Sequence, residues 1–227
     1  MISKENSGRS SMRSHCLILK GGFIMKSSNG DKWSGNTKSI YSILGASSHS
    51  EEKRADSDYY ATDPRALARL LKRFNAFQHK VWEPACGEGH LAKVLVEKKY
   101  QVKKSDIMVR SYPCEQIDFL NYNDEWDGDI ITNPPYALAT EFVLHALELL
   151  HPMNMAAFFL KIQFLETKRR YETIFKKQPP KYVFVFRDRI TVAKNGDIKE
   201  FEKSSAVCYA WYIWSKGLGG PTIIDWL

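Results

Sequence analysis

The sequence predicts an α/β fold with a doubly wound, mainly parallel sheet and one antiparallel strand near the C-terminus. Three observations predict it. From Tyr59 onward, short apolar stretches of strand character alternate with stretches whose apolar residues repeat at helical spacing. The apolar run from Met155 to Ile162 is typical of a strand buried on both faces. A further stretch of strand character, from Ala206 to Trp214, is predicted to form a long strand that runs antiparallel to the others.

Local signals place the individual elements in order. Thr62-Asp63-Pro64 supplies a capping residue followed by proline at the first helical position, and apolar residues then repeat at helical spacing up to Phe74. Further helices are predicted over residues 91–99, 138–150 and 165–177, the last of them basic. The predicted strands cover residues 81–82, 101–107, 115–119, 129–132, 155–162, 181–187, 206–214 and 222–227.

Residues 1–57 differ from the rest of the chain. They are rich in Ser, Gly, Asn and Lys and have no strand or helix period, which predicts a mostly disordered leader ahead of one domain over residues 58–227. Lys20-Gly21-Gly22 lies just before Phe23-Ile24-Met25, and its codons can spell a bacterial ribosome-binding site. We therefore expect the natural start at Met25, with residues 1–24 a translated upstream region, which the intact mass of the natural protein tests.

Composition excludes several classes of protein. Hydrophobic residues make up 44% and charged residues 26% of the 227 residues, values that are typical of a globular protein. No apolar run approaches the roughly 18–20 residues of a membrane span, and no secretory signal is recognisable. The four cysteines are scattered without a C-x-x-C pair, so neither a disulfide framework nor a metal site is expected. We expect an intracellular, cytoplasmic protein.

The first candidate site is Glu83-Pro84-Ala85-Cys86-Gly87-Glu88-Gly89-His90, between a predicted strand and a predicted helix. Glycines there let the backbone approach a ligand closely and turn sharply into the helix. Gly87, Gly89 and Ala92 also satisfy the dinucleotide pattern G-x-G-x-x-[GA], with Asp106 about 20 residues further on. The Glu-Pro pair before the glycines argues against a dinucleotide, and a glycine-rich turn without a ligand is the remaining alternative.

The second candidate site is Asn133-Pro134-Pro135-Tyr136, at the carboxyl end of a predicted strand, where ligands bind in an open α/β sheet. An exocyclic amine conjugated to an aromatic ring is a poor nucleophile, because its lone pair is delocalised. The Asn133 side-chain oxygen and the Pro134 carbonyl can accept both amino hydrogens and favour the pyramidal form, while Tyr136 offers a ring for the base to stack on. The alternatives are an ordinary proline-rich turn and a polyproline recognition peptide.

Together these two segments resemble motifs I and IV of S-adenosylmethionine-dependent amino-methyltransferases. The DNA adenine-N6 methyltransferases are the most similar group, and residues 59–227 resemble their small phage and prophage versions. The resemblance implies a Rossmann-like class I methyltransferase fold, S-adenosylmethionine as cofactor and duplex DNA as partner. It also implies the cytoplasm of a bacterial or phage-infected cell.

The resemblance assigns roles to single residues. Thr62 lies in a segment that matches the one contacting the methionine part of the cofactor, and Asp106 is similar to the acid that holds the ribose hydroxyls. Asp118 and Phe119 match the pair that meets the cofactor's adenine, although acids at strand ends are also common turn residues. The implied cofactor-binding residues are Thr62, Glu83, Pro84, Ala85, Cys86, Gly87, Gly89, Asp106, Ile107, Asp118 and Phe119.

The implied reaction is methyl transfer from S-adenosylmethionine to the N6 amine of adenine in DNA. The target base lies inside the duplex and would have to be flipped into a pocket at Tyr136. Asn133, Pro134, Pro135 and Tyr136 form the implied catalytic segment. Direct in-line displacement needs neither a metal nor a covalent nucleophile, so Cys86 is interpreted as a small loop residue and His90 as a helix-start residue.

The net charge of +7 is compatible with a nucleic-acid partner. Basic residues gather after the predicted strand 155–162. Lys168 to Arg170 are interpreted as the solvated face of a helix. The stretch 187–199, with Asn195-Gly196 as a predicted hairpin tip, is a better candidate for phosphate contacts through Arg187, Arg189, Lys194 and Lys199.

The chain departs from larger members of the family in having no room for a separate target-recognition domain after Tyr136. Specificity is therefore expected to be loose, to come from short loops such as 187–203, or to depend on an accessory partner. Methylation of an RNA base or of a protein glutamine is an alternative, because the same motif serves any planar nitrogen. A non-catalytic nucleic-acid-binding protein of this fold and a hydride-transfer enzyme are the remaining alternatives.

Overall fold

The structure, a computed structural model, describes residues 60–194, 199, 201 and 207–227. The predicted leader over residues 1–57, with its proposed start at Met25, lies outside the described residues. The predicted hairpin tip at Asn195-Gly196 and most of the loop 187–203 beyond Lys194 lie outside them as well. In the described part of the chain, no helix combines the length and apolar character needed to cross a membrane.

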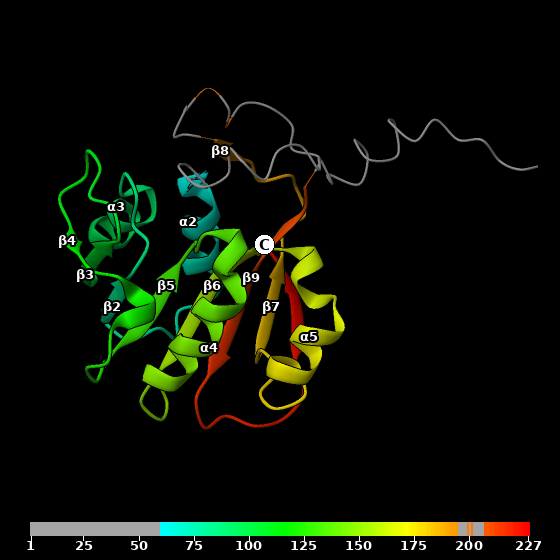
Figure 1. Cartoon of the computed structure of the whole chain (residues 1–227). Helices are drawn as coiled ribbons and strands as arrows, with labels where there is room; N and C mark the ends of the chain where they lie inside the picture. Colours follow the sequence, from blue (N-terminus) through cyan, green and yellow to red (C-terminus); the bar gives the residue numbers. More distant parts are fainter. Residues whose placement is uncertain (1–59, 195–198, 200, 202–206) are drawn as a thin grey trace, which may run out of the picture. The chain divides into compact units, whose positions relative to one another are not determined.

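An eight-stranded mixed sheet forms the centre of the fold (Figure 1), with the strand order β10-β7-β9-β6-β5-β2-β3-β4. Every neighbouring pair is parallel except those of β9, which runs antiparallel to both β6 and β7. The predicted α/β fold with one antiparallel strand near the C-terminus is confirmed. The strands are β2 (Lys80–Glu83), β3 (Gln101–Asp106), β4 (Glu115–Gln116), β5 (Asp129–Thr132), β6 (Met155–Lys161), β7 (Tyr182–Val185), β9 (Tyr209–Ser215) and β10 (Ile223–Trp226).

Helices cover both faces of this sheet because successive strand residues point to opposite sides. On one face, Ile131, Phe159 and their neighbours pack in one core cluster with α2 (Pro64–Arg73) and α3 (His90–Glu97). On the other face, Ile130 and Phe158 pack in a second cluster with α4 (Ala139–Leu149), which lies in front of β6 in Figure 1. The predicted burial of β6 on both faces is therefore confirmed, with six of its seven residues buried.

The start of α2 follows the predicted capping signal. Asp63 is the N-cap residue, and its side chain accepts a hydrogen bond of 2.9 Å from the backbone N–H of Arg65. Pro64 occupies the first helical position, where it costs no hydrogen bond. This helix follows directly on β1 (Tyr60–Thr62), a short strand that pairs antiparallel with β8 (Val192–Lys194) in a separate two-stranded sheet.

Asp129, the first residue of β5, ties two segments to the sheet. Its Oδ1 accepts from the backbone N–H of Met155 at 2.7 Å, and its Oδ2 from that of Gln78 at 2.6 Å. The side chain is fully buried, and burial raises its pKa to about 6, against the two backbone hydrogen bonds, which lower it. Asp129 thus sets where β5 and β6 start relative to the segment before β2.

Two predicted elements differ from the structure. The helix predicted over residues 165–177 is interrupted: α5 (Lys168–Arg170) is a single short turn, and a π-helical turn, η5 (Tyr171–Phe175), continues it. The strand predicted over residues 115–119 ends at Gln116, because the Asp118 side chain accepts from the N–H of Leu120 and caps a 3-10 helix, η2 (Phe119–Asn121). Side-chain capping competes with strand pairing at such a position.

Candidate active site

The predicted motifs meet at one edge of the sheet. The glycine-rich segment follows β2, Asn133 follows β5, Asp106 ends β3 and Lys161 ends β6. These strands are parallel, so their carboxyl ends share one edge. The connections leave β2 and β5 in opposite directions, which makes the crevice between them the ligand-binding position of a doubly wound sheet.

The glycine-rich turn needs its glycines. Gly87 and Gly89 have φ angles of 52° and 76°, in the left-handed region that favours glycine. A Cβ at Gly89 would also collide with ring atoms of Tyr112, in the loop between β3 and β4. The N–H of Gly87 donates to Asp106 Oδ2 at 2.8 Å, so the turn is fastened to the end of the neighbouring strand.

Glu83 places a carboxyl group beneath this turn. The residue is 1% exposed, and its Oε2 has no hydrogen-bond partner among the residues that the structure describes. Burial, and to a smaller extent the charge of Asp106, raise the pKa of Glu83 well above its ordinary value. A buried acceptor without a donor is costly, so this atom suits a ligand that brings a donor or a positive charge.

Asn133 presents a second buried acceptor. Its Nδ2 donates to the backbone carbonyl of Tyr60 at 3.1 Å, which identifies the nitrogen end of the amide and holds it against β1. Its Oδ1 is buried and accepts no hydrogen bond within the described part of the chain. The side chain is therefore fixed in orientation, with its oxygen available to a donor.

Tyr136 lies in an aromatic and cationic environment. Its ring centroid is 5.5 Å from that of Tyr60 and 6.0 Å from that of Tyr209. Lys161 Nζ lies 4.9 Å from the centre of the Tyr136 ring, within the range of a cation–π contact. Burial, followed by the neighbouring Tyr209, raises the pKa of the Tyr136 hydroxyl well above its ordinary value, so this phenol stays neutral.

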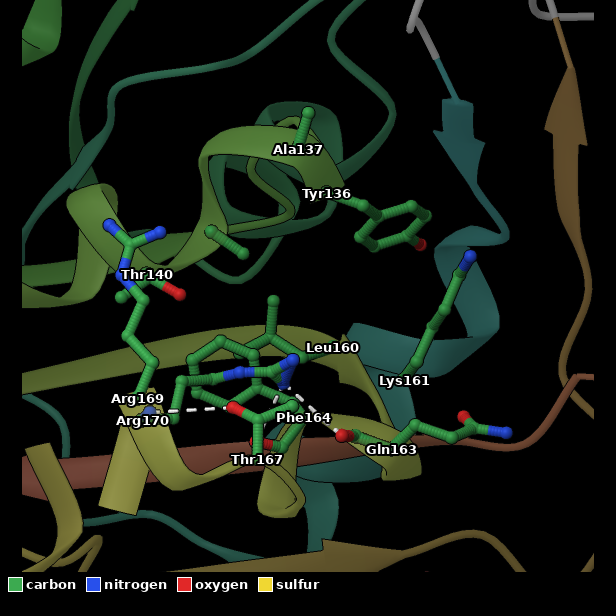
Figure 2. A pocket seen from close by; sticks show the side chains of 11 residues that line it. Tyr136, Ala137, Thr140, Leu160, Lys161, Gln163, Phe164, Thr167, Arg169 and Arg170 are labelled. Atoms are coloured by element: carbon green, nitrogen blue, oxygen red, sulfur yellow. Dashed lines mark hydrogen bonds between the residues drawn. The ribbon is translucent and has the colours of Figure 1, made fainter. Parts of the chain in front are cut away.

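Two cavities adjoin the motifs. The smaller, of about 20 Å3, lies where the segment around Thr62 meets the turn after β2. It is lined by Tyr60, Ala61, Thr62, Glu83, Ala85, Cys86, His90, Leu91 and Asn133. The larger, of about 460 Å3, lies between Tyr136 and the segment after β6 (Figure 2). Asn133 and Tyr136, three residues apart in the chain, thus face neighbouring spaces.

The sequence matches no protein-family model and no curated protein. Solved structures are similar in fold. A protein assigned as a class I S-adenosylmethionine-dependent methyltransferase from Listeria monocytogenes is 11% identical, with a TM-score of 0.50, over 83% of this chain and 71% of its own. A protein assigned as a hemolysin from Lactococcus lactis is 12% identical, with a TM-score of 0.51, over 71% of this chain and 91% of its own.

A third structure is the modification subunit assigned to a type I restriction enzyme of Vibrio vulnificus. It is 13% identical over 75% of this chain, with a TM-score of 0.51, and the match spans only 46% of that subunit. The fold is that of class I methyltransferases. Because identities are this low, the likeness establishes the fold and not the reaction.

The remaining predicted cofactor residues lie around the methyltransferase fold's carboxyl edge. Ile107 is 63% exposed beside Asp106. Asp118 is engaged by its own turn, accepting from Leu120 N–H at 3.0 Å and Asn121 Nδ2 at 2.6 Å. Phe119 is buried in the core, where its ring packs on Trp82 and Phe142, so its contact with a ligand stays a prediction. Pro84 and Ala85 continue the turn after β2.

Cys86 and His90 occupy the positions expected of loop and helix-start residues. Burial is the main cause that raises the pKa of the Cys86 thiol above its ordinary value, which disfavours the nucleophilic thiolate. His90 is the first residue of α3, and burial lowers its pKa. Among the described residues, no group of three or more His, Cys, Asp or Glu side chains could hold a metal ion.

The predicted phosphate-binding residues are only partly described. Arg187 and Arg189 are exposed and line a cavity of about 320 Å3 that also contacts Tyr209. The Arg187 Nε donates to the carbonyl of Leu227, and Arg189 contacts the Cys208 sulfur. Lys199 is exposed, and the side chain of Lys194 lies outside the described residues. Phosphate binding by these four residues stays a prediction.

The interpretation of Lys168 to Arg170 as a solvated helix face is wrong for Arg170. This residue is half-buried, and its guanidinium lies 4.8 Å from the centre of the Phe164 ring. The contacts of Tyr60 and Lys161 with Tyr136 were not predicted from the sequence. The position of Lys161 at the end of a fully apolar strand was a usable signal, because strand ends at this edge face ligands.

Proposed function

We propose that this chain transfers a methyl group from S-adenosylmethionine to the exocyclic N6 amine of adenine in DNA. The observation that carries the proposal is the buried Asn133 Oδ1, an acceptor that the described residues leave without a donor. It follows β5 directly, beside Tyr136, at the edge of the sheet where ligands bind. The N6 amine is a donor that would satisfy it.

An amine attached to an aromatic ring is a weak nucleophile. Its lone pair is delocalised into the ring, and two oxygen acceptors holding both hydrogens favour the pyramidal form that attacks. The nitrogen gains positive charge as it forms its new bond, so its hydrogen bonds to Asn133 Oδ1 and the Pro134 carbonyl strengthen in the transition state. Pro134 and Pro135 restrict the backbone that aims these oxygens. Alignment supplies the rest of the rate enhancement.

The polar side chains around the turn after β2 fit S-adenosylmethionine. Glu83 Oε2 is buried without a donor among the described residues, and a cationic ligand would stabilise its charged form. Asp106 accepts from the N–H of Gly87 through Oδ2 and from the N–H of Met108 through Oδ1, and each oxygen keeps a further lone pair for a ribose hydroxyl. Thr62 faces the same small cavity. When bound, the cofactor would supply the methyl group: its sulfur would keep the electron pair of the broken bond, and the methylated nitrogen would then lose one proton to solvent.

Entry of this cofactor requires a local opening. A cavity of about 20 Å3 holds roughly one water molecule. Two features border the turn: the Tyr112 ring, which packs on Gly89, and the strand β1, which carries the Tyr60 carbonyl. Both lie outside the eight-stranded sheet, Tyr112 in the loop between β3 and β4 and Tyr60 in the two-stranded sheet of β1 and β8.

DNA is favoured as substrate by the basic balance of the chain, +7, and by the fold shared with a subunit assigned to a restriction enzyme. A duplex adenine would be flipped to reach Tyr136. The test is transfer of labelled methyl from S-adenosylmethionine to unmethylated plasmid DNA, with RNA and cell protein in parallel. Label in DNA supports the proposal. Label only in RNA or protein overturns the substrate, and cofactor binding without transfer indicates a non-catalytic protein.

A further inference from the structure

The larger cavity at the carboxyl edge has the size and lining of a ligand site. Its volume of about 460 Å3 falls within the range of roughly 300–1,000 Å3 for small-molecule pockets. Tyr136 forms one side of it, and Leu160 and Phe164 form the apolar opposite side (Figure 2). Lys161, Arg169 and Arg170 bring positive charge to it.

Arg170 is held in a fixed position at this cavity. Its Nη1 donates to the backbone carbonyls of Gln163 and Phe164, at 3.2 and 3.0 Å. The guanidinium carbon also lies 4.8 Å from the centre of the Phe164 ring, a cation–π contact. Burial lowers its pKa, with Glu166 acting in the opposite direction, so this cation is partly desolvated and attracts an anion more strongly than one in water. The two carbonyls engage only Nη1 of a guanidinium with five N–H donors.

Arg169 offers a second cation that is easily redirected. Its Nη2 lies 2.7 Å from Glu141 Oε1, and the two side chains are 71% and 36% exposed. Exposed ion pairs of this kind contribute little to stability, so a phosphate can replace the carboxylate at little cost. In Figure 2, Arg169 and Lys161 flank the cavity from opposite sides, with Tyr136 above.

The backbone that carries these arginines is strained. Thr167 has a φ of 88°, a conformation that β-branched residues rarely adopt, and a π-helical turn follows at Tyr171–Phe175. Both features are uncommon and occur often at functional sites. The chain turns sharply at Thr167, and this turn places the Arg170 guanidinium over the Phe164 ring.

We propose that this cavity receives the target nucleotide, with its base against Tyr136 and an adjoining backbone phosphate held by Arg169 and Arg170. The inference rests on the proposed function. Lys161 Nζ lies over the Tyr136 ring, and a base stacked on that ring would replace this cation–π contact. Bidentate binding by arginine matches the geometry of a phosphate.

The test compares Arg169→Gln with Lys168→Gln, which removes the same charge from the neighbouring residue, one that does not line the cavity. The affinity of each protein for a short fluorescent DNA duplex is measured over a series of NaCl concentrations. We expect Arg169→Gln to make the negative slope of log K against log salt less steep by about 0.9, the value for one phosphate contact, with the slope for Lys168→Gln unchanged. We expect KM for DNA to rise in Arg169→Gln with kcat nearly unchanged.

Arg170→Lys keeps the charge and removes the fork. It is expected to weaken duplex binding at an unchanged salt slope, and circular dichroism checks that it folds. Equal slopes and affinities for Arg169→Gln and Lys168→Gln overturn the inference, even where the wild type methylates DNA. If the two variants differ in slope as predicted but the wild type transfers no methyl group to DNA, only the proposed function is overturned. A wild type that does not bind the duplex overturns both.

Discussion

Replacing Glu83 by glutamine separates what this carboxyl group does for the fold from what it does for a ligand. The residue is 1% exposed, and burial and the nearby Asp106 raise its pKa well above the ordinary value. A group whose pKa is raised on folding stabilises the protein below its unfolded pKa, near 4.3, and loses that contribution as the pH rises through the folded value. An isosteric amide does not titrate. We therefore expect Glu83→Gln to gain stability relative to the wild type as the pH rises.

The same substitution should weaken the binding of S-adenosylmethionine, although it stabilises the fold at high pH. A hydrogen bond or contact between a charged acceptor and a cationic ligand contributes about 1.5–3 kcal/mol, which corresponds to about a 10- to 150-fold change in Kd. Glu83→Gln should therefore weaken S-adenosylmethionine binding by that factor at pH 8. Binding to the wild type should release protons, because a cation lowers the pKa of the buried carboxyl group.

Calorimetric titration in two buffers of different ionisation enthalpy measures both the affinity and the protons released. Denaturant unfolding from pH 5 to pH 8 measures the stability difference. Glu97→Gln, at the exposed end of α3, is the matched control and should change neither quantity. The reasoning is refuted if Glu83→Gln binds S-adenosylmethionine as tightly as the wild type and unfolds more easily at high pH.

Two other substitutions test the site and the sheet. Gly89→Ala should lower the free energy of unfolding by more than the roughly 1–2 kcal/mol that a left-handed non-glycine residue costs, because its Cβ would meet the Tyr112 ring. Gly217→Ala is the control: its φ is 93° with open space around it, so it should cost only that amount. Equal losses in denaturant unfolding would contradict the contact between Gly89 and Tyr112. Asp129→Asn should lower stability by about 1–3 kcal/mol at pH 7, because an amide cannot accept from both Gln78 and Met155 N–H groups. With the Asp129 pKa raised to about 6, the wild type's advantage over Asp129→Asn should be larger near pH 4 and shrink by about 2 kcal/mol as the pH rises to 6. A constant difference would show that the pKa is not raised.

The elements that could be predicted from sequence are those specified by neighbouring residues. The α2 start was predicted because Asp63 and Pro64 are a local capping signal, and the structure shows that cap. The position of Asn133 and Gly87 at one edge was predictable because parallel strands share their carboxyl ends. The first signal lies within a few residues, and the second follows from the strand–helix alternation that predicts a parallel sheet.

Features that depend on distant partners could not be predicted in this way. The strands β1 and β8 are three residues each and are separated by more than a hundred positions, so neither shows a period of its own. Arg170 was misinterpreted because helical periodicity gives no sign of the positive φ at Thr167, which turns its guanidinium onto Phe164. The interaction of Gly89 with Tyr112 likewise depends on how the loop after β3 returns across the turn.

The most direct test of the central claim is the identity of the methylated product. Plasmid DNA is incubated with S-adenosylmethionine and either the wild type or Asn133→Ala, digested to nucleosides and analysed by mass spectrometry. We expect N6-methyladenine from the wild type and a rate about 10- to 150-fold lower for Asn133→Ala, from the loss of one hydrogen bond to a charged amine. Methylation at another atom, or an undiminished rate in Asn133→Ala, would contradict the account.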